Sequence, residues 1–241
     1  MDKTKGLSIR VLYIHKKIEM DYKFKVNSVD NVDLIVDTIK EYGICIIEDF
    51  IPNIDDIKKE SLSAIKKHNK KYEFGDFAIL RNEKIKNYNQ INKLFNQQVF
   101  KEISTKYLDR KSNINDEVYI THDYINDKGT GRNGFLHFDR TYTFKFFIYL
   151  TDVDEGCGPF TVIPKTHLVG KKLRKKYHNN SYEKKKNRIF KDHPDLGYTE
   201  KDLVPIIGNS GTLIIFDTDL FHMGGKTNEN KERMIIRGHT R

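Results

Sequence analysis

Cysteine is scarce in this chain of 241 residues, and long apolar runs are absent. The two cysteines, Cys45 and Cys157, form no close pair, no Cys-x-x-Cys motif and no Cys/His arrangement typical of a nucleophile. We therefore expect no disulfide framework, and the chain fits a reducing cytoplasm. No stretch predicts a membrane span, and the amino terminus has no apolar signal region.

Positive charge is concentrated in one segment. The formal net charge is +9, but residues 165–191 alone carry nine lysines and two arginines against one acidic residue, a local charge of +10. The rest of the chain therefore sums to −1. The segment is either a solvated insertion in a chain rich in lysine and asparagine, or a lid that attracts an anionic substrate, such as a phosphorylated or nucleotide-linked molecule.

The first half of the chain is predicted to be mainly helical. Apolar residues at helical spacing favour a helix over residues 29–42, which Gly43 would end. A second amphipathic helix is expected over 54–72, and one or two more over 84–108. The short apolar run 44–47 predicts a buried strand.

Short strands dominate the second half. Residues 117–125 alternate in polarity, and residues 126–131 predict a turn. Further strands are expected at 133–139, 142–151, 159–163, 203–207, 211–217 and 233–239. Such strands, separated by Gly, Pro and Asp, indicate a β-sandwich or barrel. We expect one domain over residues 1–241, in which a mostly helical part, 1–110, packs on a β-rich core, 115–241.

Three residues predict a metal site. His137 and Asp139 are two apart, so on an extended strand their side chains point to the same face. His222 lies 83 residues after Asp139, behind a strand-like run of its own. Two imidazoles and one carboxylate are the ligands of the facial triad that binds non-haem Fe(II) and leaves positions open. Because His-x-Asp alone is common by chance, the prediction depends on its surroundings.

Arg233 follows His222 by eleven residues and begins another strand-like run. Its guanidinium could pair in bidentate fashion with the far carboxylate of an oxo-acid cosubstrate. On a strand, Arg237 and Arg241 would share its face, and Arg237 would either line the same cavity or be structural.

Two neighbouring strands offer further candidates for cosubstrate contacts. Lys145 and Phe147 share one face of the strand at 142–151. Lys145 is either inside, where it would meet a carboxylate, or an exposed edge lysine. Phe147 would pack beside the cosubstrate or in ordinary core.

On the preceding strand, His122 and Tyr124 share one face and Thr121 and Asp123 the other. Either pair could hydrogen-bond the cosubstrate or substrate, and His122 and Tyr124 are taken as cofactor-binding candidates. His167 ends a Pro-x-Thr-His turn, where we expect a structural hydrogen bond rather than a metal ligand.

With these residues in place, the chain resembles the phytanoyl-CoA dioxygenase family of Fe(II)- and 2-oxoglutarate-dependent oxygenases. The resemblance is clear over about residues 115–241 and faint before them, except at 41–50. It is carried, besides Arg233, by residues 136–140, 144–167, 211–218 and 221–225. Lys165 departs from the pattern, because relatives usually have glycine at that position of the turn.

The resemblance implies a mainly β fold with flanking helices around a double-stranded β-helix (jelly-roll, cupin-like) core. It also implies Fe(II), 2-oxoglutarate and O2 as cofactor and cosubstrates, and hydroxylation of a small molecule with release of succinate and CO2. Asp139 favours hydroxylation over halogenation, because related halogenases have Gly or Ala there. The expected substrate is an anionic molecule, a carbohydrate or a specialised metabolite.

Two alternatives remain open. A nucleic-acid demethylase of the same superfamily would suit the basic segment, but those enzymes usually have a longer interval between the second histidine and the arginine. The sequence also shows no basic stripe with interleaved aromatics, so nucleic acid is not the expected partner. The other alternative is a non-catalytic binding protein on the same fold, against which the intact set of four residues argues.

Overall fold

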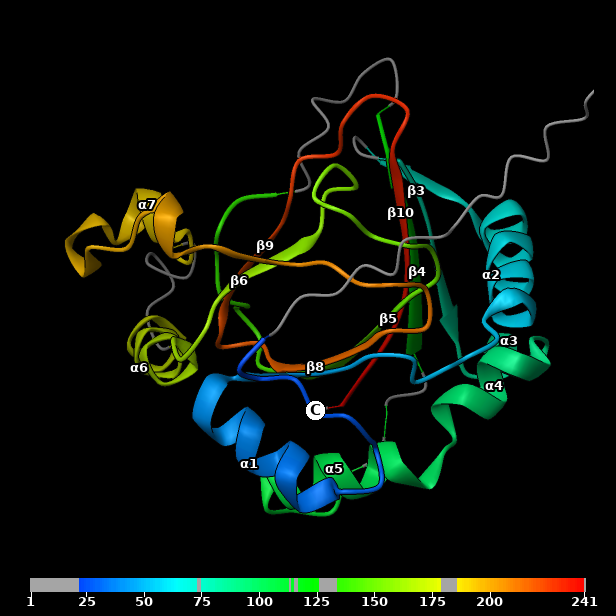
Figure 1. The fold of residues 1–241 in the computed structure, drawn as a ribbon, viewed down its shortest axis with the longest axis horizontal. Coiled ribbons are helices and arrows are strands. Elements are labelled where there is room, and N and C mark those ends of the chain that lie inside the picture. The colour runs from blue at the N-terminus through cyan, green and yellow to red at the C-terminus, as the bar shows by residue number, and fades with distance from the viewer. Residues whose placement is uncertain are drawn as a thin grey trace, which may run out of the picture.

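The computed structural model describes residues 22–72, 75–112, 114, 117–125, 134–178 and 186–240. In these residues two sheets face each other, and helices cover the outside (Figure 1). The larger sheet has seven strands in the order β1-β8-β5-β10-β4-β3-β2, and the smaller has three in the order β7-β6-β9. The architecture is the jelly roll with flanking helices that the family resemblance implies.

All strand pairings within the two sheets of the described chain are antiparallel. The larger sheet consists of β1 (Ile44–Ile47), β2 (Lys70–Tyr72), β3 (Gly75–Arg81), β4 (Glu117–Tyr124), β5 (Phe144–Tyr149), β8 (Leu213–Asp217) and β10 (Glu232–Thr240). The smaller sheet consists of β6 (Phe160–Ile163), β7 (Val204–Ile206) and β9 (Phe221–Gly224).

The helices fall into two groups. Those of the first half are α1 (Val32–Tyr42), α2 (Asp55–His68), α3 (Glu83–Lys86), α4 (Asn89–Phe95) and α5 (Gln98–Leu108). They lie outside the larger sheet, whereas α6 (His167–His178) and α7 (Ile189–Asp192) lie beyond the smaller one (Figure 1). Within the described residues, no helix has both the length and the apolar character needed to cross a bilayer.

Local sequence explains where α1 begins and ends. The Asn31 side chain accepts a hydrogen bond from the Leu34 N–H at 3.0 Å, which satisfies a free donor of the first turn. Gly43 ends the helix with φ of 79°, a left-handed conformation that suits glycine. The apolar face, with Ile35 and Ile39, is buried against the larger sheet.

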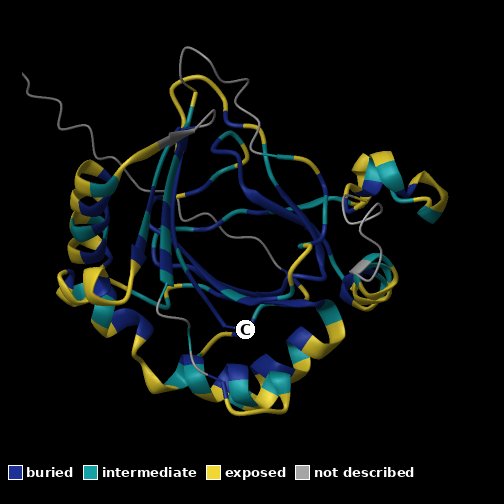
Figure 2. Ribbon diagram, turned by 180° about the vertical axis from the view of Figure 1, so that it is seen from behind, coloured by how far each residue is buried: buried dark blue, intermediate teal, exposed yellow. Residues whose placement is uncertain are grey.

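The alternation of residues along the strands divides the interior into layers. On β5, Phe146 and Ile148 belong to the apolar cluster shared with the helices, whereas Phe147 and Tyr149 belong to the cluster between the sheets. Figure 2 shows the strands as the buried centre and the helices with their exposed faces outward. The space between the sheets is therefore lined by one residue in two from each central strand.

Two predicted elements differ in the structure. The second helix ends at His68 rather than residue 72, because the chain turns there into the hairpin of β2 and β3. The described part of the strand expected at 133–139 forms isolated bridges at His137 instead of a continuous ladder. Strands β2, β3 and β9 are not among the predicted elements, and β9, with four residues, is too short to show a period of its own. The predicted turn at 126–131 lies outside the described residues.

Candidate active site

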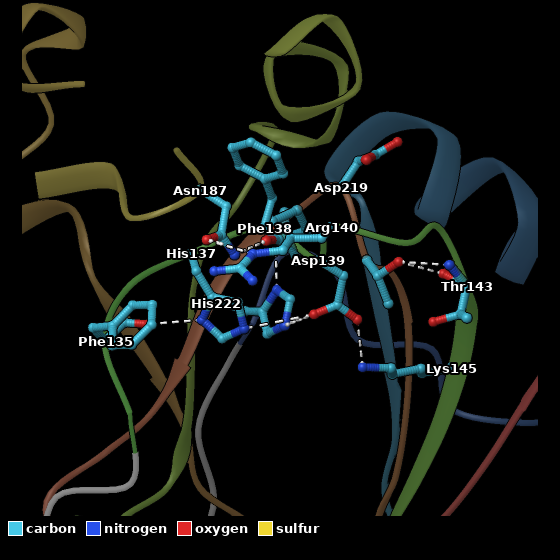
Figure 3. A network of polar contacts seen from close by, with 12 residues as sticks. Phe135, His137, Phe138, Asp139, Arg140, Thr143, Lys145, Asn187, Asp219 and His222 are labelled. Carbon is cyan, nitrogen blue, oxygen red and sulfur yellow. Dashed lines mark hydrogen bonds and ion pairs between the residues drawn. The ribbon is translucent and has the colours of Figure 1, made fainter. Parts of the chain in front are cut away.

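The structure brings His137, Asp139 and His222 together between the sheets (Figure 3). One ligand atom from each residue lies within 4.8 Å of the others. The Nε2 atoms of both histidines are 3.5 Å from Asp139 Oδ1, and the two ring centroids are 4.5 Å apart. Two imidazole nitrogens and one carboxylate oxygen converging on one point suit non-haem Fe(II) and leave further coordination positions free.

Backbone hydrogen bonds hold the three residues in place although they are far apart in the sequence. The His137 N–H donates to the His222 carbonyl at 2.9 Å, and the His222 N–H donates back at 2.8 Å. The Asp139 N–H donates to the Thr218 carbonyl at 2.9 Å. The metal-ligand geometry therefore depends on the turn after β8 as much as on the ligands' own segments.

The same arrangement presents both histidines in the form that binds metal. Nδ1 of His137 lies 2.7 Å from the Phe135 carbonyl, and Nδ1 of His222 lies 2.7 Å from the Leu220 carbonyl. Because a carbonyl only accepts, each Nδ1 carries the proton and each Nε2 offers its lone pair. Burial lowers the pKa of His222 to about 4, so His222 is neutral at physiological pH.

Lys145 divides the two oxygens of Asp139 between different tasks. Its Nζ donates to Asp139 Oδ2 at 2.6 Å, while Oδ1 faces the histidines (Figure 3). Burial raises the pKa of Asp139, but the charge of Lys145 acts against burial, and the pKa of this carboxyl lies well below its usual value. Lys145 thus lies inside the molecule and meets a carboxylate, and it is not an exposed edge lysine.

A cavity of about 320 Å³ opens beside the triad. Besides the three metal-ligand candidates, it is lined among others by Thr121, Asp123, Lys145, Phe147, Arg233 and Arg237. Phe147 belongs to it through the aromatic group that also contains Phe160 and Phe216, with ring centroids 5.2 and 4.9 Å away. The cavity therefore joins a metal-binding end, an aromatic wall and a cationic strand.

Arg233 lies at the cavity, but it already has a partner. Its Nε and Nη2 donate to Asp123 Oδ2 at 3.1 and 2.5 Å, and its Nη1 donates to the Gly158 carbonyl. Arg233 and Asp123 are 3% and 1% exposed. The arginine predicted to bind the cosubstrate is thus an ion-pair partner that links the larger sheet to the start of β6.

His122 and Tyr124 do not reach the cavity. His122 Nε2 lies 2.8 Å from Glu232 Oε2, and the Tyr124 hydroxyl donates to Asp76 Oδ2 at 2.6 Å. The other pair of β4, Thr121 and Asp123, lines the cavity instead. The choice of His122 and Tyr124 as cofactor-binding candidates is therefore corrected, because alternate residues of one strand point to opposite faces.

His167 has the structural role expected of it. It is buried at the start of α6, and its Nε2 donates to the Lys40 carbonyl at 3.1 Å. Just before it, Lys165 has φ of 68°, a left-handed conformation that favours glycine, the residue that the family resemblance leads us to expect there. The Lys165 ammonium compensates in part by pairing with Glu41 at 2.9 Å.

The basic segment contributes to the site in two ways that no motif signals. In α6, Arg174 donates to both carboxylate oxygens of Asp219 at 2.5 and 2.8 Å and so holds the turn that carries the Thr218 carbonyl. Further on, the Asn187 side chain donates to the Phe138 carbonyl at 2.8 Å, and the Arg188 guanidinium stacks on the Phe135 ring. Both contacts support the metal-ligand segment from outside.

The jelly roll and its triad together define a class, the oxygenases that use non-haem iron. The family model described as "Phytanoyl-CoA dioxygenase (PhyH)" matches residues 39–235. Since this match covers most of the chain, the protein belongs to the phytanoyl-CoA dioxygenase family. The predicted class, an Fe(II)- and 2-oxoglutarate-dependent oxygenase, is thereby confirmed.

Several solved structures share the fold. The epimerase SnoN from nogalamycin biosynthesis, in complex with Fe3+, alpha ketoglutarate and nogalamycin RO, has a TM-score of 0.68 at 10% identity, over 88% of this chain and 84% of that chain. The carbocyclase SnoK has a TM-score of 0.64 at 14% identity, over 85% and 82%. HygX from Streptomyces hygroscopicus, with nickel and 2-oxoglutarate bound, has 0.55 at 11%, over 84% of each. No curated protein matches the sequence.

Proposed function

We propose that the protein hydroxylates an anionic small molecule and converts 2-oxoglutarate to succinate and CO2. The observation that carries this proposal is the convergence of His137, Asp139 and His222 at the end of a cavity with cationic walls. The carboxylate in the triad favours hydroxylation. Because similar folds include an epimerase and a carbocyclase, the outcome of the reaction is part of the proposal.

Iron bound at the triad would supply the activation of O2 that is coupled to decarboxylation of 2-oxoglutarate. The chain's own groups prepare that site. The carbonyls of Phe135 and Leu220 fix the two imidazole rings, and Lys145 keeps one oxygen of Asp139 away from the metal position. The Phe216 ring, 5.3 Å from the His222 ring, packs beside the triad and excludes water from one side of it.

The size and charge of the cavity support the proposed substrate class. About 320 Å³ is at the small end of ligand pockets, so 2-oxoglutarate leaves room for only a small molecule or the end of a larger one. Three cations, Lys145, Arg233 and Arg237, line it against two carboxylates, Asp123 and Asp139, and this excess of one positive charge favours an anion. Cys45 and Cys157 are free and buried, which supports our proposal of a cytoplasmic enzyme.

The test is an anaerobic titration of metal-free protein with Fe(II) and 2-oxoglutarate, followed by the visible charge-transfer band of the chelated cosubstrate. The band should need both components, vanish in Asp139→Ala and persist in Asp154→Ala, whose carboxylate pairs with Lys231 at the surface. Succinate release should then be screened with anionic small molecules. No band in the wild-type protein would refute the proposal and favour the binding-protein alternative.

A further inference from the structure

A second cavity, of about 450 Å³, lies among the helices and shares no lining residue with the cavity beside the triad. Residues of α1, α5 and α6 border it, and α6 belongs to the basic segment 165–191. Its volume is within the usual range of small-molecule pockets. The helices that cover the jelly roll therefore leave room for a ligand of their own.

Positive charge converges on this cavity from all three helical segments. The charged residues that line it are four cations and one carboxylate, namely Lys40, Arg110, Lys171 and Arg174 against Asp217. The carboxylate of Asp219, which pairs with Arg174, adds a second negative charge, so four cations and two carboxylates leave an excess of two positive charges. A cleft lined mainly by one sign of charge raises the local concentration of ions of the opposite sign.

Three of the cations are available to a ligand. Within the described residues, none of Lys40, Arg110 and Lys171 forms a salt bridge or a side-chain hydrogen bond, and all three are exposed. Glu41, the acidic residue next to Lys40, pairs instead with Lys165 at 2.9 Å. The charge at the rim of the cavity is therefore not spent on contacts within the chain.

The carboxylate of Asp217 is occupied at the buried end of the cavity. Its Oδ2 accepts hydrogen bonds from the hydroxyls of Tyr107 at 2.6 Å and Tyr142 at 3.2 Å, and its Oδ1 accepts one from the Asp219 N–H at 2.8 Å. Asp217 is 6% exposed. Because both of its oxygens already have donors, this carboxylate does not need the lysines or the arginine at the rim as partners.

The backbone that carries the cations is fixed. The His167 Nε2 donates to the Lys40 carbonyl at 3.1 Å, which ties the start of α6 to the end of α1. Further along α6, both carboxylate oxygens of Asp219 accept hydrogen bonds from Arg174. A ligand that enters between the helices therefore meets walls whose spacing is already set, which lowers the cost of binding.

We propose that this cavity binds a phosphorylated small molecule at a site separate from the metal centre. A phosphate group carries up to two negative charges and several acceptor oxygens, so it can meet lysine and arginine side chains at the same time. Leu168 lines the same cavity and is 58% exposed, so it offers a contact to the apolar part of such a molecule. This inference does not depend on the proposed function.

The test is calorimetric titration of the full-length, metal-free protein with inorganic pyrophosphate at low ionic strength. Arg110→Gln combined with Lys171→Gln should weaken pyrophosphate binding by about tenfold or more, the effect of lost charge-assisted contacts. Both residues are exposed and unpaired within the described chain, so the double variant should keep the urea unfolding midpoint of the wild-type protein.

The matched control removes two cations from another basic pocket, of about 370 Å³, through Lys67→Gln with Lys84→Gln. Because distant charges are screened, this variant should keep the wild-type affinity within about twofold. Lys145→Met, which removes a cation from the cavity beside the triad, should keep it as well. The inference is overturned if the wild-type protein does not bind pyrophosphate, if the control weakens binding as much as the Arg110 and Lys171 variant, or if Lys145→Met abolishes it.

Discussion

Replacing Arg233 with methionine should lower the free energy of unfolding by about 3–5 kcal/mol, the usual effect of removing one partner of a buried ion pair. Both side chains of the pair are almost fully buried, at 3% and 1% exposure. The substitution takes away the cation that lies 2.5 Å from the Asp123 carboxylate, and it also removes the donor to the Gly158 carbonyl. Since domains are stable by only about 5–15 kcal/mol, the loss would be a large share of the total.

The measurement is urea unfolding of the metal-free protein, so that no ligand contributes to stability. The control is a surface ion pair, that of Lys231 and Asp154, in which Lys231 lies close to Arg233 in the sequence. Lys231 and Asp154 are 2.5 Å apart but 47% and 42% exposed, so Lys231→Met should cost under about 1 kcal/mol. Replacing both buried partners, Asp123→Leu with Arg233→Met, should recover most of the loss, because no buried charge is left alone.

The reasoning fails if Arg233→Met costs no more than Lys231→Met. That result would mean that the buried pair does not form in the folded protein, and Arg233 would again be available to a ligand. A large loss that the double replacement does not recover would point to packing rather than charge as the role of Arg233.

Three further predictions concern other parts of the molecule. Lys145→Met should raise the pH at which acid releases bound Co(II), because Lys145 lowers the pKa of Asp139; an unchanged or lower midpoint would contradict this. Gly170→Ala should lower the free energy of unfolding in urea by about 1–3 kcal/mol, since its new Cβ would overlap the Asp219 carbonyl oxygen. The control is a surface change on the same helix, Leu168→Ala, which should lower it by under about 0.5 kcal/mol. Burial raises the pKa of the Cys45 thiol from 9.0 to about 12, so ionisation of this thiol favours the unfolded chain above pH 9. By pH 10 the wild-type protein should lose about 1.4 kcal/mol more free energy of unfolding than Cys45→Ala, and equal losses would rule this out.

The features that the sequence predicts well depend on residue type, spacing and backbone preference within single segments. The spacing of His137 and Asp139, the second histidine and the family pattern were enough to identify the metal-ligand candidates, because those residue types in that order have few other uses. The end of α1 at Gly43 and most strands followed from backbone preferences and from alternation within single segments. None of these predictions required knowledge of what a segment packs against.

The tertiary structure alone decided which way each strand faces and which charges meet. Period two shows that Thr121 and Asp123 share a face, but only the pairing of β4 with β10 and β3 turns that face toward the cavity. In the same way, only the assembled sheet shows that Lys145 is not an edge lysine, because β5 lies between β8 and β10, and that its side chain faces the cavity. Arg233 and Arg237 look equivalent in the sequence, yet one meets a carboxylate 110 residues away and the other meets two aromatic rings. Such long-range contacts depend on strand register, which no single segment encodes.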